Sequence, residues 1–329
     1  CDVDAESHTI DPQQVAALIT PRTSGILGVH LWGRICDVKV LERIARRHRL
    51  RLLYDAAHAF ACSHRGMMVG NFGDAEVFSF HATKFINTLE GGAVVTNDDD
   101  LAHRARAMRN FGLTTGEVTA GVGINGKMNE VSAAMGLTLL EGLDGLMALN
   151  RRNYRAYRRE LHHLPGINLI SYDVAERCNY QYVVLEIEQV EAGIGRDELL
   201  EALRLENILA RRYFYPGCHR MSPYCDDGRC VRRSLPQTER VVGQTLALPT
   251  GTAITPQIVR DVCLLIRWIV AHGREVRRAL RRRVMSEGFY VSIDPLVQSS
   301  KQPSCDTCPM HTTVCTLPDL HLIVREGGL

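Results

Sequence analysis

The sequence predicts an α/β protein built on a mostly parallel sheet, and two observations support this prediction. An apolar run at 25–31 is followed by a helical pattern after Asp37 and then by a second apolar run at 50–54. Strand, helix and strand in this order form a βαβ unit, which joins parallel strands through a right-handed crossover. Shorter apolar runs at 75–80 and 92–96 add two strands to the same sheet.

Capping residues and helical spacing of apolar residues place the helices. Asp37 precedes one helix, Asn97 precedes a helix that reaches Met108, and Asn129 with Glu130 opens a helix rich in Ala and Leu. The second half is predicted to contain a strand at 180–187 and helices at 150–164, 196–206 and 257–272.

These elements predict three segments of the chain. Residues 1–164 form a large domain that carries the parallel sheet, and residues 165–283 form a smaller α+β domain. From residue 284 to 329 the periodicity is lost among Pro, Ser and Cys residues, so we predict an irregular tail.

Composition excludes several classes of protein. The 39 Lys and Arg residues nearly balance 37 Asp and Glu residues, so no global positive charge drives binding to nucleic acid. The longest apolar stretch, 262–271, is too short to cross a membrane, and no signal peptide opens the chain. Most of the 11 cysteines are scattered singly, which is typical of reduced thiols in a cytoplasmic protein.

A carboxylate and a lysine follow two of the predicted strands. Asp55 ends the strand at 50–54, and Lys84 comes shortly after the strand at 75–80. Ligands of open α/β sheets bind at the carboxyl ends of strands. Pyridoxal phosphate needs a lysine for its Schiff base and a carboxylate facing its pyridine nitrogen, which this pair supplies. A turn-forming aspartate and a solvated lysine are the alternative interpretation.

The residues of the motifs around Asp55 and Lys84 are a more specific signal than the spacing of the two side chains. The sequence resembles the DegT/DnrJ/EryC1/StrS family of pyridoxal-phosphate-dependent sugar aminotransferases over about residues 2–272. The motifs are VHLWG at 29–33, YDAAHA at 54–59, GMMVG at 66–70, FSFHATK at 78–84, EGGAVVTND at 90–98, RNFG at 109–112 and GINGKMNE at 123–130. The resemblance implies the aspartate-aminotransferase-like fold (fold type I) and a cofactor-binding large domain at 1–164.

The resemblance also implies roles for the matching residues. Lys84 matches the Schiff-base lysine, Asp55 the partner of the pyridinium nitrogen, and His58 a residue near the phenolic oxygen. Ser79 matches a hydroxyl that contacts the phosphate, and Asn125 an asparagine that reaches the phosphate of the neighbouring subunit. A homodimer with shared active sites follows from the last match. Packing in the core, a backbone contact and a turn are the structural alternatives for His58, Ser79 and Asn125.

Two further matches concern the substrate. Lys127 stands where the family carries Arg or Lys, and His219 matches a histidine near the sugar nucleotide, although a histidine in a Pro-Gly loop is also commonly just exposed. The implied reaction transfers the amino group of glutamate to a nucleotide-linked keto sugar, most specifically a dTDP-4-keto-6-deoxyhexose. Amination of a cyclitol or an aminobenzoate, and an inactive member serving as a scaffold, are the alternatives.

The chain also departs from the family pattern at its start. Family members begin well before the equivalent of Val3, so we expect a phosphate-binding Gly-Thr/Ser turn and a ring-stacking aromatic to be absent. Without those phosphate donors the chain as given is a candidate for an inactive fragment.

Two sequence features outside the motifs suggest other ligands. The spacing of Cys305, Cys308, His311 and Cys315 superficially resembles a zinc site, but it lies outside the family pattern, and we predict no metal. A basic helix is the second feature, and a solvated helix explains it better than a nucleic-acid face does. Its arginines are Arg274, Arg277, Arg278, Arg281, Arg282 and Arg283.

Overall fold

The computed structural model describes residues 1–114, 118–226 and 234–287. Beyond Glu287 the predicted tail lies outside the described residues, and so do Cys305, Cys308, His311 and Cys315 of the superficial zinc motif.

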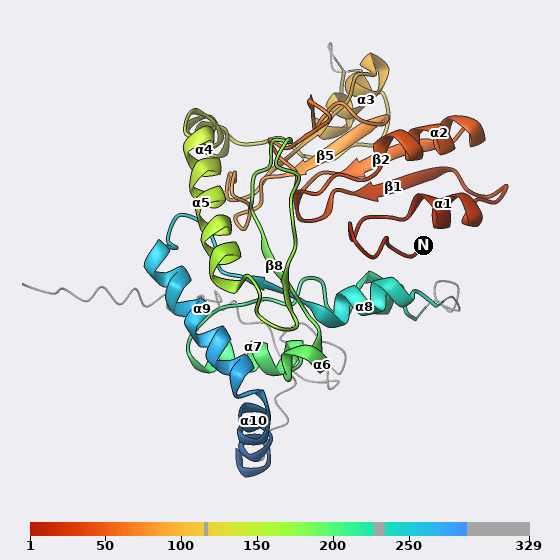
Figure 1. Cartoon of the computed structure of the whole chain (residues 1–329). Helices are drawn as coiled ribbons and strands as arrows, with labels where there is room; N and C mark the ends of the chain where they lie inside the picture. The colour runs from red at the N-terminus through yellow and green to blue at the C-terminus, as the bar shows by residue number, and fades with distance from the viewer. Residues whose placement is uncertain (115–117, 227–233, 288–329) are drawn as a thin grey trace, which may run out of the picture. The chain divides into compact units, whose positions relative to one another are not determined.

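The first sheet is mixed and mostly parallel, as predicted. Its order is β1-β2-β5-β6, with β6 antiparallel to β5 at one edge. Figure 1 shows β1, β2 and β5 side by side. Register places Asp55 opposite both Val29 and Val77, so the carboxyl ends of the three parallel strands lie at one edge. The strands are β1 (Gly25–Val29), β2 (Arg51–Asp55), β5 (Ala75–Ser79) and β6 (Gly92–Val95).

The predicted βαβ unit is present. Helix α2 (Val38–His48) connects β1 to β2, and Asp37 caps it by accepting a hydrogen bond from the Val40 amide at 3.2 Å. Arg49 ends the helix in the left-handed conformation, with φ of 55°. The following helix, α3 (Asp99–Arg109), is capped by Asp98 instead of the predicted Asn97, because the Asp98 carboxylate accepts from the Leu101 amide.

Two helices connect the sheets. Asn129 caps α4 (Glu130–Glu141), as predicted, and α5 (Leu143–Leu161) begins earlier than the predicted residue 150, continuing through Gly145. Among the described residues, no helix is by itself long and apolar enough to cross a membrane. The pair α4 and α5, bent by 66°, meets that length and composition together.

The second sheet is antiparallel, with order β7-β8-β9. The predicted strand at 180–187 begins later, at Val183, because Tyr180 adopts a positive φ of 48°. Helix α9 packs against α5 beside this sheet (Figure 1). The elements are β7 (Ile167–Leu169), β8 (Val183–Ile187), β9 (Thr245–Leu248), α7 (Arg196–Leu205) and α9 (Pro256–Ala271).

Shorter elements complete the described chain. The arginine-rich segment forms α10, and its arginines are half-buried or exposed. These elements are α1 (Pro12–Leu18), a 3-10 turn (Leu31–Gly33), β3 (Ser63–His64), β4 (Met67–Met68), α6 (Gln189–Ala192), a second 3-10 turn (Cys218–Arg220), α8 (Pro236–Gln244) and α10 (Gly273–Glu287).

Separate hydrophobic cores accompany the two sheets. Leu41, Tyr54 and Phe72 belong to the core of the first sheet. Tyr157 and Leu161 of α5 belong to the core of the second sheet, although they precede residue 164. The division into domains at 164 therefore stays a prediction.

One face of the first sheet is apolar and open to solvent. Alternate residues of its strands point to this face, and each is between 37% and 61% exposed. Mostly parallel sheets are normally covered on both faces, and exposed apolar surface of this kind is typical of surfaces that associate. The residues are Leu27, Val29, Leu53, Val77 and Val94.

A buried polar pair, His30 and Glu76, lies on the opposite face of the first sheet. His30 Nε2 lies 3.1 Å from Glu76 Oε1, and both side chains are fully buried. Because His30 Nδ1 accepts from the Cys36 amide, Nε2 carries the proton and donates to Glu76. The amides of Gly70 and Phe72 also donate to Glu76, so three donors depend on one carboxylate.

We expect Glu76→Ala to lower the free energy of unfolding by about 3 kcal/mol or more, since it leaves three buried donors unpaired. Urea denaturation measures this loss. Glu42→Ala removes a half-buried carboxylate paired with the exposed Arg46 on α2 and is the matched control, with a loss under about 0.5 kcal/mol. Equal losses for the two variants would show that the Glu76 network contributes no more than a surface pair.

Candidate active site

The candidate site begins where β2 and β5 end. Asp55, the last residue of β2, is half-buried, and its Oδ1 accepts a hydrogen bond from the Ala57 amide at 2.9 Å. Ser79, the last residue of β5, accepts from the His81 amide at 3.3 Å. Parallel pairing of the two strands brings these polar groups to the same edge.

Lys84 lies in the loop that follows β5. The Lys84 amide donates to the His81 carbonyl, and the Thr88 amide returns to the Phe80 carbonyl, each at 2.9 Å. Half-burial of the side chain lowers the pKa of Lys84, and the negative charge of Asp55 opposes part of that shift. A larger fraction of its amine is therefore neutral, and nucleophilic, than in an exposed lysine.

His58 lies beside this pair and is almost fully buried. Its ring is 4.4 Å from the ring of Tyr182 and stacks with Trp32 and Phe214. Burial, with a smaller contribution from the charge of Lys84, lowers the pKa of His58 to about 3. Because its Nδ1 accepts from the Trp32 amide at 3.3 Å, the neutral ring carries its proton on Nε2.

A cavity of about 290 Å³ adjoins Lys84. Its polar lining consists of amides and hydroxyls, and Lys84 is the one charged side chain among the described residues that line it. The polar lining residues are Thr83, Lys84, Asn87, Asn150, Gln181, Thr250 and Thr252. Asp55 and His58 do not line this cavity, so Lys84 is the residue that joins it to the carboxylate and the neutral imidazole.

Comparison with known proteins identifies the class of this site. A model of the DegT/DnrJ/EryC1/StrS aminotransferase family matches residues 1–267. The chain belongs to this family of aminotransferases. The motif resemblance and the predicted fold class are thereby confirmed.

Individual family members are similar over most of the chain. A dTDP-4-amino-4,6-dideoxy-D-glucose transaminase of Shigella dysenteriae is 34% identical over 82% of this chain and 72% of its own length. GDP-perosamine synthase of Caulobacter vibrioides is 36% identical over 77% of this chain and 68% of its own. A structure of DesI with its TDP-sugar product is 47% identical, with a TM-score of 0.81, and covers 85% of this chain and 71% of DesI.

The other residues that the family motifs single out make different contacts. Asn125 is exposed and pairs with Asn110 in an isolated β-bridge, while Lys127 Nζ lies 4.1 Å from the centre of the Phe111 ring. His219 Nε2 lies 2.8 Å from Glu239 Oε1. The structure thus brings Asp55, His58 and Lys84 together, with Ser79 at the same edge of the sheet. The cofactor and substrate roles of all these residues, and those of Asn125, Lys127 and His219, stay predictions.

Residues 179–182, Phe214 and Asn150 belong to the site but were absent from the sequence prediction. Asn179 connects them, since its side-chain amide donates to the carbonyls of His58 and Phe60 at 2.9 and 3.0 Å. The available signal was Gln181, a polar residue at the start of an otherwise apolar and aromatic run. The contact of Phe214 with His58 has no local sequence signal.

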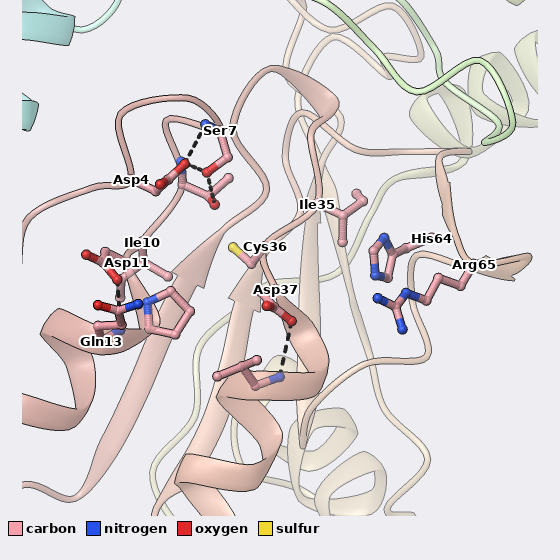
Figure 2. A pocket seen from close by; sticks show the side chains of 13 residues that line it. Asp4, Ser7, Ile10, Asp11, Gln13, Ile35, Cys36, Asp37, His64 and Arg65 are labelled. Carbon is pink, nitrogen blue, oxygen red and sulfur yellow. Dashed lines mark hydrogen bonds between the residues drawn. The ribbon is translucent and has the colours of Figure 1, made fainter.

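A second cavity, of about 480 Å³, lies away from these residues (Figure 2). Figure 2 shows Asp4, Asp11 and Asp37 around it, each accepting a backbone hydrogen bond that closes a turn or caps a helix. Within the described parts of the chain, no three His, Cys, Asp or Glu side chains are grouped to hold a metal ion. These carboxylates therefore have a structural explanation.

The low pKa of His58 predicts a specific pH dependence of stability. The folded protein keeps the ring neutral, whereas the unfolded chain protonates it near pH 6.5, so this contribution is present above pH 6.5 and is lost toward pH 3. We expect the free energy of unfolding to fall by about 1 kcal/mol per pH unit between pH 6.5 and 5 from this group alone. His58→Gln should remove that slope, as measured by urea denaturation at several pH values. An unchanged slope in the variant would contradict the neutral, buried state of His58.

Proposed function

We propose that the chain binds pyridoxal phosphate at Lys84, Asp55 and His58 and transfers an amino group from glutamate to a nucleotide-linked keto sugar. The observation that carries the proposal is the half-buried Lys84 amine, lowered in pKa, beside a carboxylate and a neutral imidazole. Membership of an aminotransferase family supports it independently.

The donor set fits the cofactor group by group. Asp55 uses Oδ1 for the Ala57 amide, while its Oδ2 makes no hydrogen bond to the described residues and suits a protonated pyridine nitrogen. His58 Nε2–H is a donor for a phenolic oxygen, and the Lys84 amine is a nucleophile for an aldehyde carbon. Ser79 Oγ accepts a hydrogen bond from the His81 amide, which leaves its hydroxyl proton to donate to the phosphate.

These residues divide the chemistry between them. When bound, the cofactor supplies an electron sink for the carbanion that transamination requires. Lys84 Nζ then acts as the base that removes the proton from the α-carbon of glutamate and, in the second half-reaction, returns a proton at the sugar carbon. His58 remains neutral, so it does not compete for that proton.

The names of the relatives support the substrate class. The Shigella relative is named for a dTDP-linked 4-amino-4,6-dideoxyhexose, and the DesI structure contains a TDP-sugar product. We therefore propose a dTDP-4-keto-6-deoxyhexose as the amino acceptor. All seven cysteines of the described residues are free thiols, which supports a cytoplasmic location.

A homodimer is also proposed, and α4 supports it. Val131, Leu137 and Leu140 on this helix are 75%, 65% and 44% exposed. The same helix borders an apolar cavity that Phe80 and Thr88 of the Lys84 loop also line. A second copy seated on α4 would contact the loop that carries the catalytic lysine, which agrees with shared active sites.

Lys84→Ala is the direct test of the cofactor assignment. We expect the variant to lose the visible absorbance of the lysine-bound cofactor and at least about 1,000-fold in transamination rate, because the amine that moves the proton is missing. Lys39→Ala, at an exposed position on α2, should retain both properties. An unchanged spectrum in Lys84→Ala would refute the assignment.

Leu137→Glu tests the dimer. A charge in the apolar surface of α4 should convert the dimer to a monomer in analytical ultracentrifugation, because an unpaired carboxylate cannot be buried at an interface. Val190→Glu, at a 92% exposed apolar residue on α6, is the matched control and should leave the sedimentation coefficient unchanged. A Leu137→Glu protein that still sediments as a dimer would place the interface elsewhere.

A further inference from the structure

Gln181 is the feature of the site that neither the motifs nor the proposed chemistry uses. It lines the cavity beside Lys84, and its side chain is nine-tenths buried. Its Nε2 has no hydrogen-bond partner among the described residues, a state it shares with the hydroxyl of Tyr54. Tyr54, in contrast, lies in the core of the first sheet and does not line this cavity.

The neighbouring amides of the cavity are already engaged. Asn150 Nδ2 donates to the Asn179 carbonyl at 3.1 Å, and Asn87 Nδ2 donates to the Lys84 carbonyl at the same distance. The Thr250 hydroxyl receives a hydrogen bond from Asn153 at 3.4 Å. The Gln181 amide is therefore a donor of the cavity lining that the protein itself leaves unpaired.

The backbone of Gln181 is held firmly beside the catalytic residues. Its amide donates to Asn179 Oδ1 at 3.0 Å, and the same Asn179 side chain donates to the carbonyls of His58 and Phe60. The terminal torsion of a glutamine is soft, so the amide group turns toward the cavity at little cost. A fixed backbone with an adjustable terminal donor suits recognition of a bound oxygen atom.

The scarcity of charged side chains in the cavity lining indicates which kind of ligand oxygen Gln181 contacts. Apart from Lys84, the described residues of the cavity carry no charge, so the cavity has no arginine clamp for a diphosphate or for the two carboxylates of glutamate. Hydroxyl and ring oxygens of a hexose need neutral donors and acceptors of this kind. An unpaired buried donor is costly, and a ligand oxygen removes that cost on binding.

We propose that the Gln181 side-chain amide donates a hydrogen bond to a hexose oxygen of the nucleotide-sugar substrate and is a specificity-determining residue. This inference rests on the proposed nucleotide-sugar aminotransferase function and assigns the cavity beside Lys84 to the hexose rather than to the nucleotide.

Isothermal titration calorimetry of two probes with the cofactor-loaded protein tests the role of Gln181. dTDP-glucose carries the hexose, whereas dTDP lacks it, and neither probe undergoes transamination. Gln181→Met keeps the volume of the side chain but removes the donor, so we expect dTDP-glucose to bind at least about 10-fold more weakly while the affinity for dTDP is unchanged. Gln257→Met, at an exposed glutamine of α9, is the matched control and should leave both affinities unchanged.

A thermal melt of the free protein separates recognition from folding. Because Gln181→Met removes an unpaired buried donor, its melting temperature should equal or exceed that of the wild type. A lower melting temperature together with equal weakening of both probes would show a structural role and overturn the inference.

The remaining outcomes distinguish the inference from the proposed function. Wild-type protein that transaminates keto sugars, with unchanged dTDP-glucose binding in Gln181→Met, overturns the role of Gln181 alone. An increase in the KM for glutamate, with the affinity for dTDP-glucose intact, would assign the amide to the amino donor and also overturn it. Wild-type protein that binds neither probe and transaminates no keto sugar would overturn both.

Discussion

The parallel pairing of β2 with β5 is the constraint on which the site depends. With Asp55 opposite Val77, the carboxylate that ends β2 reaches the edge from which the Ser79–Lys84 loop departs. The amide of Ala56 continues the pairing by donating to the Val77 carbonyl at 2.8 Å, so the His58 turn leaves the sheet in register with that loop. A shift of one residue would point Asp55 to the opposite face and remove the charge that opposes the lowering of the Lys84 pKa by burial.

Burial then gives the three groups different chemical states. Lys84 is buried enough to lose part of its basicity but keeps the charge of Asp55 nearby, whereas His58 is buried so fully that it stays neutral. Asn179 joins this edge to the segment before β8 through the carbonyls of His58 and Phe60. The His58 turn and the Gln181 segment that lines the cavity are consequently held by one hydrogen-bonded framework rather than by independent loops.

Local sequence signals predicted the elements whose limits are set locally. Apolar runs that stop at Asp55 and near Ser79 defined the strand ends, and Asp37 and Asn129 defined helix starts, because side-chain caps act within a few residues. The neighbouring Asp98 and Asn97 are both good caps, and the sequence did not distinguish them. The sequence missed the late start of β8 and the places of Phe214 and Gln181, since those depend on contacts with residues far away in the chain.

Partial burial beside Asp55 lowers the basicity of Lys84, and the proposed chemistry depends on this shift. The most direct measurement is the pH dependence of amine modification in the cofactor-free protein, with Lys84 and the exposed Lys39 followed separately by mass spectrometry. We expect a lower midpoint for Lys84 than for Lys39, and a further decrease in Asp55→Asn, because Asp55 raises the pKa of Lys84. A Lys84 midpoint equal to or above that of Lys39 would show that burial does not lower the basicity of Lys84.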